Sequence, residues 1–211
     1  MLLPLPCAWR AASAEQPIHV AFQTDEVGKA PRGWVSRNKD PGKIYFVQEE
    51  GGKKYLHADA RDASEPLGYQ KPWPLGEYPI LQWQWRAVLF PSNSDERKKS
   101  GSDSALAVYV VFGRWPFIKC LKYIWSDTLP VGASFASPFS SRTRLIVLES
   151  GRAATGTWVS ERHDVLSDYR RFFDACETPT ARGIAVLTDS DNTHSHAVGD
   201  YGEFETLPAA P

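Results

Sequence analysis

The chain has 211 residues and a mass of 23.6 kDa, which is enough for one well-buried core. Its 24 Lys and Arg residues nearly balance its 25 Asp and Glu residues, and the net charge of -1 gives no sign of a nucleic-acid or anionic-membrane surface. No apolar stretch approaches the roughly 20 residues of a membrane-spanning helix, so no transmembrane span is expected. Eight Trp, eight Tyr and ten Phe residues against one Met favour strands over helices.

The first 14 residues resemble the end of a secretory signal. An apolar stretch precedes the triplet Ala12-Ser13-Ala14, whose small residues fit a cleavage site. The apolar stretch is short and no basic residue precedes it, so a disordered tail is the alternative. We expect a truncated signal over residues 1–14, a single domain over residues 15–211, and a periplasmic or secreted protein.

Most segments after residue 17 have the pattern of short strands. Residues 81–89 are the clearest case, because Trp83 and Trp85 alternate with Gln82, Gln84 and Arg86. This alternation predicts a strand with an aromatic core face and a polar second face. The other expected strands are 18–22, 43–48, 55–58, 105–112, 121–125, 145–148, 157–160, 184–187 and 203–207. Four tryptophans are expected in the core, namely Trp34, Trp83, Trp85 and Trp158.

One segment has helical spacing instead. Apolar residues repeat with the period of a helix between Val165 and Phe173, and Asp164 stands where an N-cap belongs. We therefore predict one short helix from about Val165 to Asp174. About ten strands with a single helix predict an all-β fold, an antiparallel β-sandwich of jelly-roll type. The polar stretch 92–103 is expected to be a long exposed loop or lid.

The polar face of the 81–89 strand is the main candidate ligand-binding strip. Gln82, Gln84 and Arg86 offer the planar hydrogen-bonding groups that sugars require, and Tyr123 or Trp125 could supply the aromatic platform beside them. A polar face that only meets solvent or a covering loop is the alternative.

Charged residues elsewhere extend the set of candidate ligand-binding residues to Asp103, Glu161 and Arg162. Glu161 and Arg162 alternate in direction on a strand, so one of them faces the polar surface. Two carboxylates about 5–10 Å apart could serve a glycosidase, so a hydrolase using a pair from Glu161, Asp103 and Asp189 is an alternative function. The sequence contains no Gly-x-Ser-x-Gly elbow and no phosphate-binding glycine loop, which favours binding over catalysis, and no catalytic residue is assigned.

An apolar run at residues 183–187 leads directly into a cluster of oxygen-bearing side chains. Asp189, Asp191 and Thr193 could bind a cation such as calcium, or they could form a purely structural Asx-rich turn. An EF-hand is disfavoured because His194 stands where its loop needs Gly. A phosphatase of the haloacid-dehalogenase type is disfavoured because only 18 residues follow Thr193.

Several short blocks occur together along the chain. They are Pro31-Arg32-Gly33-Trp34, Tyr78–Trp85, Ser102-Asp103, Val108–Phe112, Leu121–Trp125, Gly156–Arg162, Asp168-Tyr169, Asp189–Thr193 and Tyr201. In combination these blocks resemble a bacterial family known only as domain of unknown function 3047. That family has no described function, so the resemblance implies no reaction. The family pattern pairs the block that contains Arg162 with the acidic loop, the block Asp189–Thr193. This pairing implies that Asp189 and Asp191 are structural and held by Arg162 or by calcium.

The first and last strands are also similar to galactose-binding-like jelly rolls. This looser resemblance implies glycan binding and a structural calcium. Members of the first family usually have Asn where this chain has His163, so no role is carried over to that position.

The leading hypothesis is thus a non-catalytic binding module whose partner is a glycan or another polar small ligand. One alternative is a carbohydrate-active hydrolase of the cell envelope. Another is a structural or scaffold subunit with a protein partner. No cofactor is expected apart from a structural calcium ion.

Overall fold

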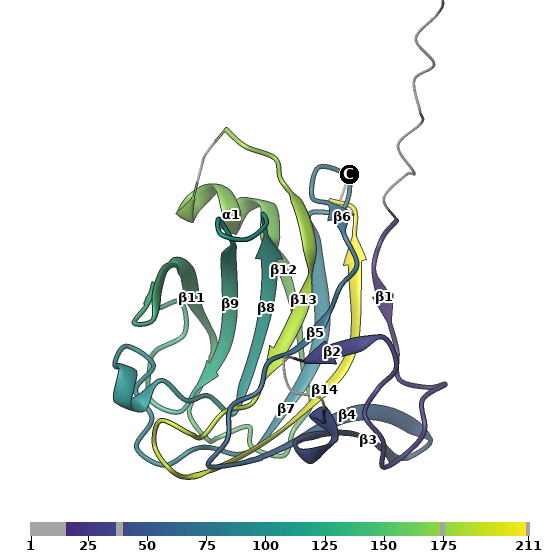
Figure 1. The fold of residues 1–211 in the computed structure, drawn as a ribbon, viewed down its shortest axis with the longest axis vertical. Helices are drawn as coiled ribbons and strands as arrows, with labels where there is room; N and C mark the ends of the chain where they lie inside the picture. The colour runs from purple at the N-terminus through teal and green to yellow at the C-terminus, as the bar shows by residue number, and fades with distance from the viewer. Residues whose placement is uncertain (1–15, 37–39, 174–175, 210–211) are drawn as a thin grey trace, which may run out of the picture.

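The computed structural model of the protein describes residues 16–36, 40–173 and 176–209, so the expected signal segment lies outside the described residues. The strands form two sheets that face each other (Figure 1). A single α-helix accompanies them in the described part of the chain. The predicted all-β sandwich of jelly-roll type is confirmed.

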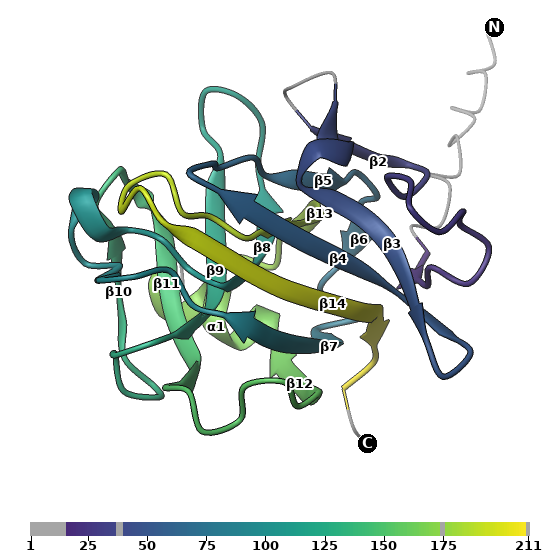
Figure 2. The same ribbon diagram turned by 90° about the horizontal axis from the view of Figure 1, so that it is seen from below.

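The six-stranded sheet has the order β12-β7-β14-β4-β3, with β1 paired to β14, and all of its pairings are antiparallel. Figure 2 shows its long strands side by side, with the second sheet behind them. The bounds of its strands are β1 (His19–Val20), β3 (Tyr45–Glu50), β4 (Lys53–Arg61), β7 (Ile80–Leu89), β12 (Val159–Asp164) and β14 (His196–Leu207).

The eight-stranded sheet has the order β10-β11-β9-β8-β13-β5-β2, with β6 paired to β13. Its strands are β2 (Trp34–Ser36), β5 (Leu67–Tyr69), β6 (Trp73–Pro74), β8 (Leu106–Phe112), β9 (Lys119–Ser126), β10 (Ser134–Ser137), β11 (Ser140–Ser150) and β13 (Thr180–Leu187). Strands β9 and β11 are parallel, unlike the expected pattern, because the intervening strand β10 lies at the sheet edge beyond β11. Sequence periodicity misses β2, β5, β6 and β10 because such short segments do not establish an alternation.

The core lies between the sheets and is rich in aromatic rings. Trp83 and Trp85 on β7 are 1% and 0% exposed. The ring of Trp83 packs 5.6 Å from that of Tyr123, and the ring of Trp85 packs 6.1 Å from that of Trp125. The inward direction predicted for Trp83 and Trp85 is confirmed. Trp34 is also buried, as expected.

The helix α1 (Val165–Phe172) lies at one end of the sandwich (Figure 1), where the Lys119 ammonium at the start of β9 lies 5.2 Å from the Tyr169 ring. It begins where the sequence predicts, since the Asp164 side chain accepts a hydrogen bond from the Ser167 amide at 2.8 Å. Tyr169 anchors the helix by packing its ring 4.7 Å from that of Phe112. Among the described residues, no helix is long and apolar enough to cross a bilayer.

The stretch 92–103 is only partly the exposed loop that its composition predicts. Glu96 and Asp103 are fully buried, and a short 3-10 helix, η2 (Lys99–Gly101), closes the segment. The Glu96 carboxylate accepts a hydrogen bond from the Ser126 hydroxyl at 2.9 Å. The loop is therefore packed onto the sandwich, which argues against a mobile lid. A second 3-10 helix, η1 (Pro41–Lys43), precedes β3.

Candidate functional site

A row of side chains crosses the outer face of the six-stranded sheet. The strand registers place Arg86 opposite Asp200, Asp200 opposite His57, and His57 opposite Phe46. Residues paired directly across adjacent strands point to the same face of a sheet. These four residues, from four neighbouring strands, therefore lie in one row.

The centre of this row is a charged cluster built around Arg86. Its Nε donates to Asp200 Oδ2 at 2.7 Å and its Nη1 donates to Glu50 Oε2 at 2.8 Å. The other Asp200 oxygen lies 2.7 Å from Nδ1 of His57, and the Asp200 side chain is 1% exposed. Burial alone would lower the pKa of Arg86, but the hydrogen bonds and attraction from Asp200 and Glu50 outweigh it and raise that pKa. Arg86 is therefore a cation held in place by counter-ions that belong to the protein.

Two aromatic rings cover the Arg86 guanidinium. Its central carbon lies 4.7 Å from the ring of Trp158 and 5.3 Å from the ring of Tyr55, and the two rings meet edge to face at 5.4 Å. These rings come from β4 and from the residue before β12, with β14 and β7 between them. The structure thus corrects two expectations. Trp158 is half-buried on the outer face, not in the core, and the aromatic group beside Arg86 is Tyr55 with Trp158.

The rings border a groove with a volume of about 540 Å³. Strand β14 contributes Gly202 to its wall, where a Cβ atom would come within 3.0 Å of the Gln84 Cβ. The absence of a side chain there leaves the groove open between Tyr55 and Gln84. The remaining lining is mainly polar, with Gln23, Glu50, Lys53, Lys54, Gln82, Trp83, Trp158, Glu203 and Glu205.

The groove presents the groups that recognise a polyhydroxylated ring. Gln84 is exposed, and its amide nitrogen donates to the Ser160 hydroxyl at 3.2 Å. This hydrogen bond fixes the orientation of the whole amide group, including its oxygen. The Tyr55 hydroxyl donates to Gln48 Oε1 at 2.9 Å, which fixes the aromatic ring. Planar amides and carboxylates beside a fixed aromatic surface suit the hydroxyl groups and apolar faces of sugars.

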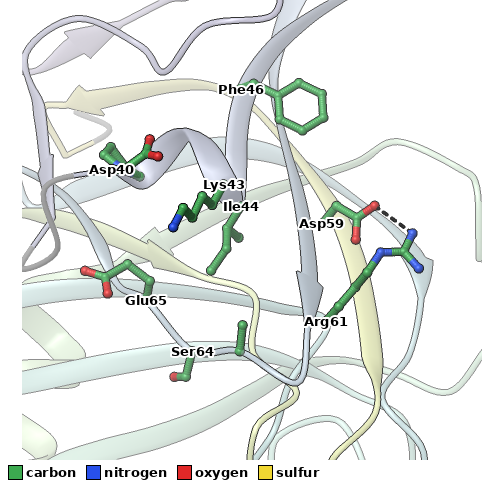
Figure 3. Close-up of a pocket in the computed structure, with 10 residues that line it drawn as sticks. Asp40, Lys43, Ile44, Phe46, Asp59, Arg61, Ser64 and Glu65 are labelled. Atoms are coloured by element: carbon green, nitrogen blue, oxygen red, sulfur yellow. Dashed lines mark hydrogen bonds and ion pairs between the residues drawn. The ribbon is translucent and has the colours of Figure 1, made fainter.

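A second hollow, of about 740 Å³, lies on the same face beyond Phe46 (Figure 3). Asp59 and Arg61 form an ion pair at 3.1 Å along one side of it. Burial opposes the ionisation of Asp59, but hydrogen bonds from His196 and then Arg61 dominate and lower the pKa of this carboxyl. Charges of both signs line this hollow, so it has no single preferred ion.

The remaining candidates for the ligand-binding strip fall in different places. Arg162 is exposed on the outer face, opposite Gln82 in the neighbouring strand, as the strip requires. Tyr123 and Trp125 are 0% and 1% exposed and face the core, so the prediction that they form the platform is wrong. Strand β9 belongs to the other sheet and presents these rings inward, which periodicity within one strand does not reveal.

Glu161 is also an inward residue. Its carboxylate accepts from Nε1 of Trp85 at 3.1 Å and lies 3.2 Å from Nε2 of His163. The carboxyl that pairs with it is Glu149, whose pKa is raised by burial and by repulsion from Glu161. The sequence does not indicate this pair, because β11 and β12 lie in different sheets.

The acidic loop forms a third cluster, at the end of β13. Carboxylate oxygens of Asp103, Asp189 and Asp191 lie within 4.8 Å of one another. Asp103 is held by the Thr193 amide and hydroxyl at 2.8 Å and 2.6 Å, so Thr193 is a hydrogen-bond donor to the cluster. Asp103 therefore joins Asp189 and Asp191 as the third potential cation ligand, in the place expected for Thr193. Calcium binding here stays a prediction.

Asp189 is held by the backbone. Its Oδ1 accepts from the Ser104 amide at 2.7 Å, and burial raises its pKa to about 7 although the nearby Lys122 opposes that change. The expectation that Arg162 holds the loop is wrong, because Arg162 is exposed on β12 in the other sheet. The Asp103 and Asp189 contacts support the structural interpretation of the loop.

Comparison with known proteins gives a family and a set of distant structural neighbours. The family described as "Protein of unknown function (DUF3047)" matches residues 32–205, in agreement with the sequence blocks. No curated protein sequence matches the chain.

The structural neighbours include proteins with carbohydrate-related names. The family 11 carbohydrate-binding module of cellulase Lic26A-Cel5E of Clostridium thermocellum is 8% identical, with 93% of this chain and 97% of that chain covered and a TM-score of 0.48. TmCBM61 in complex with beta-1,4-galactotriose is 9% identical, with 89% and 94% covered and a TM-score of 0.42. Trichoderma harzianum endoglucanase 3 of family GH12 is 10% identical, with 93% and 100% covered and a TM-score of 0.43. Likeness at this level does not assign a function.

Proposed function

Because the chain belongs to the DUF3047 family, whose description carries no activity, we propose a function from the geometry of the outer face: the protein is a non-catalytic module that binds carbohydrate. The observation that carries the proposal is the groove in which Tyr55 and Trp158 meet over Arg86 beside Gln84. An oligosaccharide is the favoured ligand, since the hollow at Phe46 lies on the same face.

Aromatic and polar groups in the groove would make different contacts with a sugar. The half-buried ring of Trp158, backed by the buried ring of Tyr55, removes the apolar face of a sugar ring from water, and the amides of Gln82 and Gln84 exchange hydrogen bonds with hydroxyl groups. Arg86 is already paired with Asp200 and Glu50, so it contributes rigidity and does not attract an anionic ligand strongly. A neutral glycan fits this site better than a polyanionic one.

The test starts with a glycan array and continues with titration calorimetry on an oligosaccharide that the array identifies. We expect Trp158→Ala to weaken binding at least about tenfold, since a stacked aromatic surface is lost. Trp115→Ala is the matched control, because Trp115 is an exposed tryptophan in the loop between β8 and β9. A wild-type protein that binds no glycan, or a Trp158→Ala variant that binds as tightly as the wild type, contradicts the proposal.

The hydrolase alternative has less support from the positions of its carboxylates. Glu161 is hydrogen-bonded to Trp85 in the core, whereas Asp103 and Asp189 meet in the acidic loop and both already accept hydrogen bonds. We expect no release of reducing ends when the protein is incubated with the polysaccharide that it binds. Release that disappears in Glu161→Gln would favour the hydrolase.

We further propose that the protein acts in the periplasm or outside the cell. The proposal rests on Ala12-Ser13-Ala14 behind an apolar stretch. Mass spectrometry of the protein from its native host should find an N-terminus near Glu15. An intact Met1 in the cytosolic fraction would contradict export.

A further inference from the structure

The loop between β8 and β9 exposes a group of large apolar side chains at one end of the sandwich. Trp115 is 85% exposed and Phe117 67% exposed, and Ile118 follows them. Soluble domains seldom leave adjacent aromatic residues in water without an interaction that uses them. We name residues 113–118 the apolar tip.

The apolar tip is an ordered turn. The Phe117 amide donates to the Arg114 carbonyl at 2.7 Å, and a guanidinium nitrogen of Arg142 donates to the Pro116 carbonyl at 2.6 Å. Gly113 has a φ of +74°, and a Cβ atom there would come within 2.7 Å of the Phe117 carbonyl oxygen. The backbone contacts therefore hold the aromatic side chains outward, because the interior of the turn is filled by the chain itself.

Two arginines lie at the apolar tip. Arg114 and Arg142 are exposed, and the Arg142 guanidinium lies 5.5 Å from the Phe117 ring. Residues 113–118 contain no carboxylate, so the positive charge of Arg114 and Arg142 is not offset within the tip itself.

We propose that the apolar tip docks the protein on an anionic lipid surface. Trp and Phe favour the interface between water and acyl chains, while arginines around them are attracted to anionic headgroups. The combination of both at one loop fits a bilayer surface better than a glycan, which carries no apolar layer to receive Trp115 and Phe117. The tip and the groove at Trp158 come from different loops, so this inference does not depend on the proposed carbohydrate binding.

Co-sedimentation of the full chain with lipid vesicles tests the proposal. We expect binding to phosphatidylcholine vesicles that contain about 30% phosphatidylglycerol, and weaker binding to phosphatidylcholine alone. The double variant W115S/F117S should lose about tenfold or more in affinity, because its apolar groups no longer leave water. Binding should also fall at about 0.5 M NaCl, where the attraction between charges is screened.

The matched control is Val131→Ser, which removes an exposed apolar side chain elsewhere. Val131 is 63% exposed, and its neighbour Gly132 is bonded to Val147, away from the tip. Hydrogen exchange should show protection of residues 113–118 when anionic vesicles are added. Equal vesicle binding by the wild type and W115S/F117S overturns the proposal. So does a wild-type protein that ignores vesicles but forms dimers that W115S/F117S does not form, since the tip then contacts a second copy.

The same variants separate the two proposals. W115S/F117S should still bind the glycan, and Trp158→Ala should still bind the vesicles. Loss of both properties in either variant would indicate a folding defect, which circular dichroism would reveal.

Discussion

Arg86 and Asp200 face each other on neighbouring strands of the six-stranded sheet, with 2.7 Å between Nε and Oδ2, and Asp200 is almost completely buried. Three residues that line the groove, Glu50, Tyr55 and Trp158, contact Arg86. Tyr55 and Trp158 cover the guanidinium, and His57 binds the second carboxylate oxygen. A buried ion pair of this kind fixes a geometry even where it adds little net stability.

Removing the cation of this pair should destabilise the fold. In Arg86→Met the Asp200 carboxylate stays buried with only His57 as a polar partner among those described, so we expect the free energy of unfolding to fall by about 2–3 kcal/mol. Urea denaturation measures the change. The control is Arg97→Met, which breaks the exposed pair with Asp95 and should leave stability close to that of the wild type. If the two substitutions changed the free energy of unfolding equally, leaving the buried Asp200 carboxylate without its cation would not destabilise the fold.

The buried carboxyl of Asp189 should make stability depend on pH. Its pKa of about 7 lies above that of an Asp in an unfolded chain, so the folded state binds the proton more tightly. This tighter proton binding stabilises the folded state. The stabilisation is fully present below about pH 4 and is lost as the pH rises to about 7. Asp189→Asn keeps an oxygen for the Ser104 amide but does not titrate. We expect its free energy of unfolding to fall less than that of the wild type over this range, with a difference on the order of 1–4 kcal/mol.

Urea denaturation at several pH values between about 4 and 8 measures that difference. Glu26→Gln removes an exposed carboxyl from the surface and serves as the control substitution. A calcium ion at Asp103, Asp189 and Asp191 would instead keep Asp189 ionised. The wild type would then become more stable with rising pH, and EDTA would lower its melting temperature.

The helix cap at Asp164 should contribute to stability on its own. Asp164→Ala removes the acceptor for the Ser167 amide, and loss of such a cap costs about 1 kcal/mol. Thermal denaturation should show a lower melting temperature for Asp164→Ala, while Asp164→Asn should retain most of the stability because its side-chain oxygen also caps. Ser167→Ala leaves the amide donor in place and should behave like the wild type. A melting temperature that does not change in Asp164→Ala would show that packing of Tyr169 alone holds the helix.

The carboxyl pair of Glu149 and Glu161 should oppose folding at neutral pH. The raised pKa of Glu149 means that the folded state favours its protonated form, so the unfavourable contribution grows as the pH rises through that pKa. Glu149→Gln should therefore raise the free energy of unfolding at about pH 8, by about 0.5 kcal/mol since Glu149 is partly exposed, and should have little effect at about pH 4. Thermal denaturation at the two pH values measures this. A stabilisation of the same size at both would exclude charge repulsion as the cause.

The alternation within residues 81–89 determines by itself that Trp83 and Trp85 enter the core and that Gln84 and Arg86 face outward. The spacing between Val165 and Phe173, together with Asp164, likewise determines where the helix begins. These features are local, since strand and helix periods and a cap depend on residues a few positions apart.

Tertiary structure decided which residues meet. Trp158 stands over Arg86, and Thr193 donates to Asp103, because of strand registers and sheet order between segments distant in sequence. The positive charge at the apolar tip also depends on tertiary structure. Arg142 on β11 donates to the Pro116 carbonyl in the loop between β8 and β9, a contact that the near-zero net charge of the chain does not indicate. Sequence patterns assign a side chain to a face of its own strand, but only the packing of the two sheets determines what lies on the other side of that face.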